Sequence, residues 1–314
     1  MSTPKINTVF IGTPDFGLPA FKALINDEQF NVVAVITQPD KKVGRKQILT
    51  APAIKIEALK NDIPVWQPEK IKDFAWPITD IDLIIVAAYA QIIPKIILDY
   101  PKFGYLNIHG SLLPLYRGAA CIQQAIIDGQ EKTGITIMLM DEGLDTGDII
   151  AQKEIAITKE DTAGTLYQKL AQLAGENIIP IIKDYIKGDI KPRAQDNRKA
   201  TYVKMLKKEN GRIDWNKPAE EIERFVRAMY PWPGAFFKLE NGQIIKIIKT
   251  GSMALDMNNY KNGTLFSSEK KLAVQCSQNA LEILELQLEG KKPINAEQFL
   301  CGHSSLVKKD EEKP

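Results

Sequence analysis

Short apolar runs alternate with amphipathic stretches through the first 190 residues of the chain. Each run has the length of a buried strand, and the stretches between the runs, such as 18–26, show the apolar spacing of helices. This alternation predicts an α/β fold built on a doubly wound, mostly parallel sheet. Ligands of such sheets bind beyond the carboxyl ends of the strands. The predicted strands are residues 6–11, 32–37, 83–88, 106–109 and 135–140.

The pattern changes near residue 190. A long amphipathic helix is expected over 162–187, and the glycine, proline and basic residues that follow indicate a basic linker over 191–209. A second amphipathic helix, at 218–229, is followed by short alternating runs at 235–239, 244–248, 272–275 and 281–288. These runs predict a small OB-like β-barrel, an architecture that commonly binds nucleic acid. We therefore expect one domain over 1–190 and another over 210–314.

Composition narrows the class of protein. The hydrophobic content of 44% and the charged content of 25% are those of an ordinary globular protein. The most apolar stretch, 81–90, is about half as long as a bilayer span. Cys121, Cys276 and Cys301 lie far apart without a CxxC pair, which indicates a reducing compartment and no structural zinc. We expect a cytoplasmic protein that needs neither a membrane nor a metal.

Basic residues gather in two segments, although the net charge is only +2. Residues 191–212 carry eight Lys and Arg against Asp196 and Glu209. Such a band can follow a phosphate backbone, but charge alone favours the simpler interpretation of a solvated linker. The second segment, 38–46, places basic residues around Gly44. It predicts either an exposed flexible loop with a cationic tip or a solvated turn.

The strongest chemical signal is the stretch YLNIHGSLLPLYRG, residues 105–118. Asn107 and His109 are two apart on a predicted strand, so both side chains point to one face. Glycine and proline then hold the chain in an irregular loop. Asp145 lies in a glycine-punctuated acidic loop, 141–148, at another strand end. These positions predict a shared pocket suited to acyl or proton transfer, whereas a lone His109 would be a hydrogen-bonded core histidine.

Each of the three groups has a role in acyl transfer to an amine. Neutral imidazole at His109 suits proton handling near neutrality. The amide N–H of Asn107 suits a developing oxyanion, and the carboxylate of Asp145 can orient the imidazole and favour its charged form. Nucleotide chemistry has little support, because Gly12 and Gly17 do not form a GxGxxG fingerprint and GxxxxGK[ST] is absent.

Two longer stretches, NIHGSLLPLYRGAA and GITIMLMDEGLDTGDII, resemble the paired signatures of 10-formyltetrahydrofolate-dependent formyltransferases. VFIGTPDFGLPAFKAL near the start and RIDWNKPAEEIERFVRAMYPWPGAF in the second half are also similar to that family. The resemblance covers most of the chain and is strongest with the branch that acts on tRNA. It implies a metal-free enzyme with Asn107, His109 and Asp145 as its catalytic residues.

The resemblance also implies the ligands and their contacts. The formyl donor would be 10-formyltetrahydrofolate, and the acceptor initiator methionyl-tRNA, bound by a protein that we expect to be monomeric. The C-terminal barrel would grip the tRNA. Folate would contact Ser111, Leu112, Leu113, Pro114, Tyr89 and Asp141. The tRNA would contact Arg45, Lys41, Lys42, Lys46, Lys207 and Lys208, and Phe16 would line the methionyl pocket.

The chain departs from the family pattern at two places. Leu115 and Tyr116 stand where Arg-Trp is usual, and Cys121 replaces a usual proline. Two alternatives also remain open. One is a sugar-nucleotide (4-amino-sugar) N-formyltransferase of the same family, against which stand the TPDF stretch, the Arg45 loop and GLDTGD. The other is an RNA-binding protein with a decayed enzymatic fold, which would be expected to lose one of the three catalytic groups.

Overall fold

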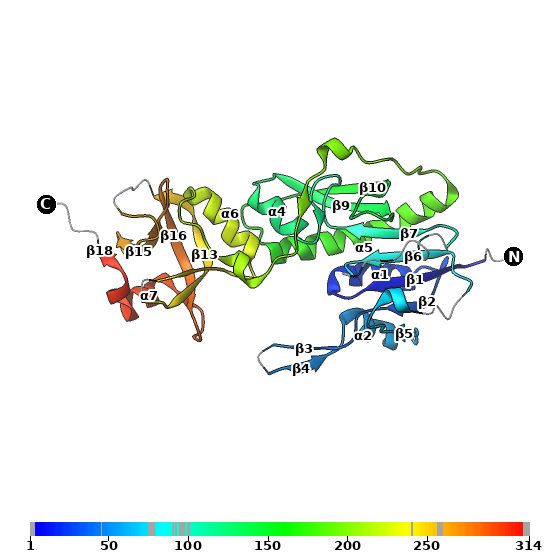
Figure 1. The fold of residues 1–314 in the computed structure, drawn as a ribbon, viewed down its shortest axis with the longest axis horizontal. Coiled ribbons are helices and arrows are strands. Elements are labelled where there is room, and N and C mark those ends of the chain that lie inside the picture. The colour runs from blue at the N-terminus through cyan, green and yellow to red at the C-terminus, as the bar shows by residue number, and fades with distance from the viewer. Residues whose placement is uncertain are drawn as a thin grey trace. The chain divides into compact units, whose positions relative to one another are not determined.

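The structure is a computed structural model that describes residues 4–44, 46–74, 79–89, 91, 93, 98, 101–239, 241–255 and 260–309. The chain forms two compact units (Figure 1). Unit 1 comprises residues 1–121, 132–156 and 167–204, and unit 2 comprises residues 122–131, 157–166 and 205–314. Each unit has its own sheet and its own core.

Unit 1 is built on a seven-stranded sheet of order β10-β9-β7-β6-β1-β2-β5. Strands β7, β6, β1, β2 and β5 run parallel, whereas β9 is antiparallel to β7 and β10 is antiparallel to β9. The predicted mostly parallel sheet is therefore confirmed. The strands are β1 (Ile6–Gly12), β2 (Phe30–Ile36), β5 (Val65–Trp66), β6 (Leu83–Ala87), β7 (Tyr105–His109), β9 (Lys132–Leu139) and β10 (Ile149–Ala156).

Helices cover this sheet because its central strands are apolar on both faces. Every residue of β6 is buried. The helices are α1 (Leu18–Ile25), α2 (Ala53–Lys60) and α5 (Ala163–Lys187), the last belonging to unit 1 from Tyr167 onward. Helix α5 packs closely on α1, since a Cβ added at Gly175 would lie 2.6 Å from the Cβ of Pro19. Short 3-10 turns are η1 (Asp15–Gly17), η2 (Ile71–Asp73) and η3 (Asn197–Lys199).

Two small pairs of strands complete unit 1. The cationic segment predicted as a loop forms a hairpin of β3 (Lys41–Val43) and β4 (Ile48–Thr50), and all six of its strand residues are exposed. Exposure was expected, but strand pairing was not. The other pair joins β8 (Arg117–Gly118) in parallel to β11 (Tyr202–Val203). Through this pair, residues of the predicted linker pack beside the predicted site.

Unit 2 contains an antiparallel β domain, as predicted. The pairs run in the order β12-β13-β16-β15-β14-β18, with β17 on β16 and only β14–β18 parallel. The strands are β12 (Ala235–Lys238), β13 (Ile244–Leu255), β14 (Leu265–Ser268), β15 (Lys271–Gln275), β16 (Ala280–Leu288), β17 (Ile294–Asn295) and β18 (Lys308–Lys309).

Helices of unit 2 present apolar residues to that sheet. Helix α6 (Ala219–Met229) buries Ala219, Ile222, Val226 and Met229, a helical stripe, and contacts β13 and β16. The remaining elements are α4 (Cys121–Ile127), α7 (Ala296–Gly302), η4 (Lys208–Gly211) and η5 (Ser304–Leu306). No helix in the described ranges is long and apolar enough to span a bilayer. Cys121, Cys276 and Cys301 are all free thiols.

Candidate active site

The structure brings Asn107, His109 and Asp145 together at the carboxyl end of β7. The His109 Nδ1 atom lies 3.5 Å from the Asp145 Oδ2 atom. The Asn107 Nδ2 atom donates to Asp145 Oδ1 at the same distance, 3.5 Å. The alternation of side chains along β7 places Asn107 and His109 on one face, and the loop after β9 supplies Asp145 between them.

Asp145 is held from several sides. Its φ angle is 53°, in the left-handed region that non-glycine residues seldom adopt. The backbone N–H of Gly118 donates to Asp145 Oδ2 at 2.7 Å, and Gln195 Nε2 donates to the Asp145 carbonyl at 2.9 Å. These hydrogen bonds hold the Asp145 backbone in this conformation and keep its carboxylate facing His109.

His109 is buried, with only 7% of its side chain exposed. Its Nε2 atom lies 3.0 Å from the carbonyl oxygen of Tyr116, while Nδ1 faces Asp145. The Asp145 carboxylate and the Tyr116 carbonyl are both hydrogen-bond acceptors, an arrangement that favours an imidazolium with two N–H groups.

The pKa of His109 is raised accordingly. Burial lowers it, but the electrostatic interaction and hydrogen bond with Cys121, followed by the Asp145 carboxylate and the Tyr116 carbonyl, outweigh burial and raise the pKa to about 9. The folded site therefore favours the charged form of the ring. Buried Cys121 contributes most to the raised pKa, followed by Asp145, whose effect was expected from the sequence, and by the Tyr116 carbonyl.

The loop after His109 is fixed by its own hydrogen bonds. Ser111 Oγ donates to the Leu115 carbonyl at 2.6 Å, and Thr136 Oγ1 donates to the Ser111 carbonyl at 2.6 Å. Leu113 is buried, and Leu112 and Pro114 are half-buried. Four of the residues predicted to contact folate thus form one rigid segment beside His109.

The other two predicted folate residues lie differently. Asp141 is exposed, and its Oδ1 atom accepts from the Gly143 N–H at 3.0 Å and from Thr146 Oγ1 at 2.6 Å, which closes the turn that leads to Asp145. The Tyr89 side chain is buried in the apolar core of unit 1, and burial raises its pKa to about 12. Its carbonyl oxygen accepts from Gln38 Nε2 at 2.8 Å.

Phe16, the predicted wall of the methionyl pocket, lies in η1 and is 4% exposed. Its ring packs on the ring of Tyr167, with 5.3 Å between centroids. The Phe16 N–H donates to Tyr167 Oη at 2.7 Å, and that hydroxyl donates to Asp15 Oδ1 at 2.7 Å. Burial and Asp15 raise the pKa of Tyr167 above its usual value.

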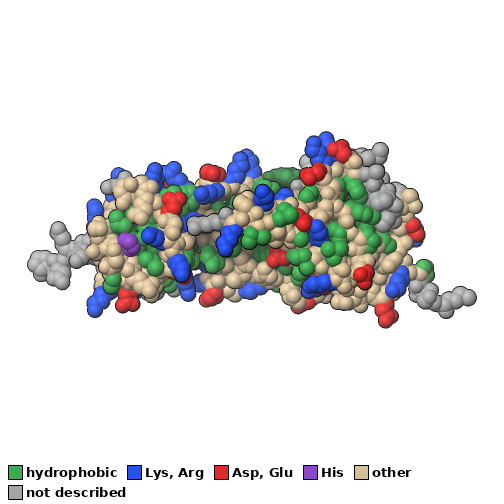
Figure 2. Space-filling view, turned by 90° about the horizontal axis from the view of Figure 1, so that it is seen from below, with side chains coloured by type: hydrophobic (Ala, Val, Ile, Leu, Met, Phe, Trp, Pro, Cys, Tyr) green, Lys and Arg blue, Asp and Glu red, His purple; other side chains and the backbone are tan. Residues whose placement is uncertain are grey.

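The predicted tRNA contacts lie on exposed elements of both units. Lys41 and Lys42 are on β3 and Lys46 is in the turn that follows, whereas Arg45 lies outside the described residues. Lys207 caps η4 and Lys208 opens it, both in unit 2. The face drawn in Figure 2 carries Lys and Arg side chains with Asp and Glu side chains among them.

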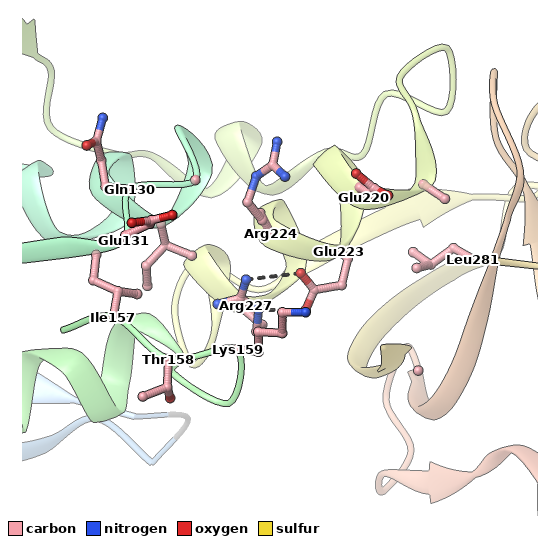
Figure 3. A pocket seen from close by; sticks show the side chains of 14 residues that line it. Gln130, Glu131, Ile157, Thr158, Lys159, Glu220, Glu223, Arg224, Arg227 and Leu281 are labelled. Carbon is pink, nitrogen blue, oxygen red and sulfur yellow. Dashed lines mark hydrogen bonds and ion pairs between the residues drawn. The ribbon is translucent and has the colours of Figure 1, made fainter. Parts of the chain in front are cut away.

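A cavity of about 420 Å³ lies within unit 2, and none of these residues is among those that line it. Its wall mixes apolar side chains with both signs of charge, among them Glu131, Lys159, Glu220 and Arg224 (Figure 3). Arg227 is tied to Glu223 by contacts of 2.6 and 3.0 Å and donates to the Asp161 carbonyl at 2.8 Å. Balanced charge without any predicted catalytic group makes this cavity a weaker candidate than the cluster at β7.

Sequence reasoning missed the groups that support the site. Gln195 and Thr201, from the predicted linker, bond to the loops that carry Asp145 and Tyr116. Their only sequence signal was polar character within a basic band, which does not distinguish a solvated segment from a packed one. Among the described residues, no group of three or more His, Cys, Asp or Glu is placed to hold a metal.

Comparison with known proteins agrees with the family resemblance. Residues 5–205 match the Formyl transferase family, and residues 205–304 match Formyl transferase, C-terminal domain. The methionyl-tRNA formyltransferase of Caldanaerobacter subterraneus subsp. tengcongensis is 42% identical over 301 residues, covering 94% of this chain and 96% of that protein. That of Thermodesulfovibrio yellowstonii is 45% identical over 298 residues, covering 94% and 95%.

Solved structures share the fold at lower identity. The sugar 3N-formyl transferase WlaRD, solved with dTDP and 5-N-formyl-THF, superposes with a TM-score of 0.68 at 22% identity, covering 92% of this chain and all of that one. HypX from Aquifex aeolicus, in complex with tetrahydrofolic acid, gives 0.61 at 18% identity, covering 98% of this chain and 49% of that one. The chain therefore belongs to the formyl transferase family, in the branch formed by its methionyl-tRNA formyltransferase relatives.

Proposed function

We propose that this protein transfers the formyl group of 10-formyltetrahydrofolate to the amino group of initiator methionyl-tRNA, giving N-formylmethionyl-tRNA for translation initiation. The observation that carries the proposal is the Asn107–His109–Asp145 cluster at the end of a parallel strand. It occurs in a chain that matches methionyl-tRNA formyltransferases over more than nine-tenths of its length. The relatives indicate that the formyl acceptor is methionyl-tRNA, and the cluster provides the side chains for formyl transfer.

The reaction begins when the methionyl amine attacks the formyl carbon, which forms a tetrahedral intermediate with an oxyanion. One N–H of the Asn107 carboxamide faces Asp145, and the second N–H is available to donate to that oxyanion. The charged ring of His109 adds positive charge beside it. His109 is buried and Asn107 is half-buried, and electrostatic stabilisation is stronger in such a setting than in water.

Collapse of the intermediate breaks the bond between the formyl carbon and the folate nitrogen. The amine gives up one proton and the folate nitrogen takes one up, so transfer through the His109–Asp145 pair leaves the enzyme unchanged. Imidazolium at His109 is already protonated and serves as the acid for the leaving nitrogen. Asp145, at 3.5 Å, stabilises that cation and takes part in returning the proton.

We further propose that catalysis and tRNA binding are carried out by different parts of the chain. Residues 1–190 would carry the chemistry, with folate along Ser111–Pro114 and the methionyl side chain near Phe16. Exposed lysines of the β3–β4 hairpin, Arg45, and residues 210–314 with Lys207 and Lys208 would hold the tRNA. The exposure of those lysines supports this assignment, because phosphate contacts need accessible cations. We keep the expectations of a monomeric, cytoplasmic, metal-free enzyme as part of the proposal.

The test offers radiolabelled 10-formyltetrahydrofolate with initiator methionyl-tRNA and a 4-amino-sugar nucleotide in parallel. Label on the tRNA alone is the expected result. Label on the sugar alone would contradict the assigned acceptor and establish the sugar-nucleotide alternative, while leaving the catalytic cluster in place. Label on neither, with folate bound, would contradict the proposed activity itself.

A further inference from the structure

Gln195 lies between a buried cation and the turn that carries Asp145. Its Oε1 atom accepts from Arg117 Nε at 3.2 Å and from Arg117 Nη2 at 2.8 Å. Its Nε2 atom donates to the Asp145 carbonyl at 2.9 Å and to the Gly147 carbonyl at 2.7 Å, and lies 4.0 Å from Met138 Sδ. All of these residues belong to unit 1.

These partners allow only one orientation of the Gln195 amide. A guanidinium only donates hydrogen bonds, so the atom facing Arg117 must be the oxygen. Backbone carbonyls only accept, so the atom facing Asp145 and Gly147 must be the nitrogen. Arg117 therefore determines which way the amide points, and the amide in turn supplies two donors to the 145–147 turn.

Arg117 is well fixed for this task. Only 1% of it is exposed. Besides Gln195 it donates to Asn197 Oδ1 at 2.7 Å and to Tyr202 Oη at 2.8 Å, and its guanidinium lies 5.6 Å from the centroid of the Tyr202 ring. A buried cation that is satisfied by neutral groups strengthens the hydrogen bonds that it donates, so Gln195 has little freedom to rotate.

The turn that Gln195 holds needs such support. The backbone of Asp145 has a left-handed conformation. Gly147 lies so close to β9 that a Cβ added to it would be 1.8 Å from the Leu139 carbonyl oxygen. Displacement of this backbone carries the Asp145 carboxylate with it. That carboxylate faces His109 and Asn107 at 3.5 Å each, a distance at which small shifts break both contacts.

The same segment supports the other side of His109. The Tyr116 N–H donates to Thr201 Oγ1 at 2.8 Å, and the Arg117 N–H donates to the Thr201 carbonyl at 2.9 Å. The backbone of Tyr116 also has a left-handed conformation, with a φ angle of 62°. Its carbonyl oxygen is the acceptor that faces His109 Nε2. Both acceptors of the imidazole are thus tied to residues 195–201.

We propose that Gln195 is a positioning residue for formyl transfer: it holds the 145–147 turn so that the Asp145 carboxylate meets His109 and Asn107. The inference rests on the proposed function for its kinetic test, but not for its geometry. It gives the predicted linker a role in catalysis without any contact to the reacting atoms.

The first test is Gln195→Glu, with Asn197→Asp as the matched control. Both substitutions place a carboxylate against Arg117, but only Gln195→Glu replaces the donor to the Asp145 and Gly147 carbonyls with an oxygen. A misplacement of about 1 Å typically costs ~10²-fold in rate, so kcat should fall ~10²-fold in Gln195→Glu while KM for folate stays within about threefold. Asn197→Asp should keep kcat within about threefold of wild type. Equal kcat values for the two variants would overturn the proposal.

A second test needs no substrate and no added charge. The chain has two histidines, so NMR titration resolves His109 with His303 as an internal reference. In Gln195→Met the pKa of His109 should fall toward its ordinary value, while Asn197→Leu should leave it unchanged. An unchanged His109 pKa in Gln195→Met would overturn the proposal even if the kinetic variant unfolds. Absence of formyl transfer by the wild-type enzyme would instead contradict the proposed function.

Discussion

Unit 1 contains two polar regions of opposite construction, the Asn107–His109–Asp145 cluster and the β3–β4 hairpin. In the cluster, His109 is 7% exposed and each charged atom faces a fixed neighbour. In the hairpin, Leu49 is 65% exposed, and the anchoring bonds lie at the base, where Asp40 accepts from Lys55 and Gln67. The cluster holds its polar side chains in fixed positions, whereas the hairpin exposes its lysine side chains to solvent.

The difference matches two physical demands. Stabilising an oxyanion requires donors that are already oriented in a setting of low dielectric constant. Holding a nucleic acid requires cations that reach phosphates, and these contacts weaken as salt screens them over about 10 Å. We therefore expect substitutions in the cluster to change the rate of the chemical step, and substitutions in the hairpin to change affinity and salt dependence.

The largest effect should come from His109→Ala. Loss of a general acid typically costs ~10²–10⁴ in rate, so kcat should fall by that amount while the affinity for tRNA is preserved. The measurement is steady-state formyl transfer together with tRNA binding. His303→Ala, the same substitution at the other histidine, should behave as wild type. A His109→Ala enzyme with near-wild-type kcat would remove this residue from the mechanism.

Stability should depend on pH through the same residue. The folded pKa of about 9 exceeds the unfolded value of about 6.5, so the folded state binds more protons between these values. The stabilisation is fully present below pH 6.5 and is lost as the pH rises through about 9. Thermal melts should show Tm falling across this window in wild type and a smaller fall in His109→Ala. Parallel pH curves for the two proteins would show that His109 does not bind its proton more tightly in the folded state.

The hairpin should give a smaller and salt-dependent effect. In the triple variant Lys41→Ala, Lys42→Ala, Lys46→Ala, KM for tRNA should rise ~10-fold at low salt and the slope of log affinity against log salt should become shallower by about one per lost phosphate contact. Folate binding should not change. Lys187→Ala, which removes one exposed cation at the end of α5, is the control for non-specific charge. An unaltered salt slope in the triple variant would separate the hairpin from tRNA binding.

Leu115 offers the smallest effect. Leu115 is 37% exposed, and Ser111 bonds to its backbone carbonyl and not to its side chain. Leu115→Arg should therefore leave kcat unchanged. An added surface cation contributes about 0.2–1 kcal/mol, which corresponds to a KM for tRNA lowered by ~1.4–5-fold. Leu115→Gln is the neutral control. Identical KM values for the two variants would show that this position does not approach the tRNA.

Much of the fold could be predicted from periodicity alone. Buried runs such as 6–11 and 83–88 became β1 and β6, because apolar residues on both faces leave a central strand little alternative. Strand β10 was missed since Gln152, Lys153 and Glu154 interrupt its apolar run at the sheet edge. Its antiparallel direction, like that of β9, leaves no trace in the pattern.

The site shows the same limit. Spacing along one strand was sufficient to pair Asn107 with His109, because alternation is local. The effect of Asp145 on the pKa of His109 was expected, but the larger effect of Cys121 and that of the Tyr116 carbonyl depend on where these groups lie after the loop has folded. The role of Gln195 was even harder to predict from the sequence. Its contact with Asp145 spans 50 residues, in a segment that the isolated bridge between Ile149 and Arg193 and the short pair of β8 with β11 bring beside the site.

The most direct test of the account is a single-turnover measurement of formyl transfer with folate and methionyl-tRNA both saturating. His109→Ala and the triple hairpin variant are compared with wild type under one salt condition. We expect the rate constant to fall ~10²-fold or more in His109→Ala, and to stay within about threefold of wild type in the hairpin variant once tRNA is bound. Equal losses in the two variants would contradict the separation of chemistry from tRNA recognition.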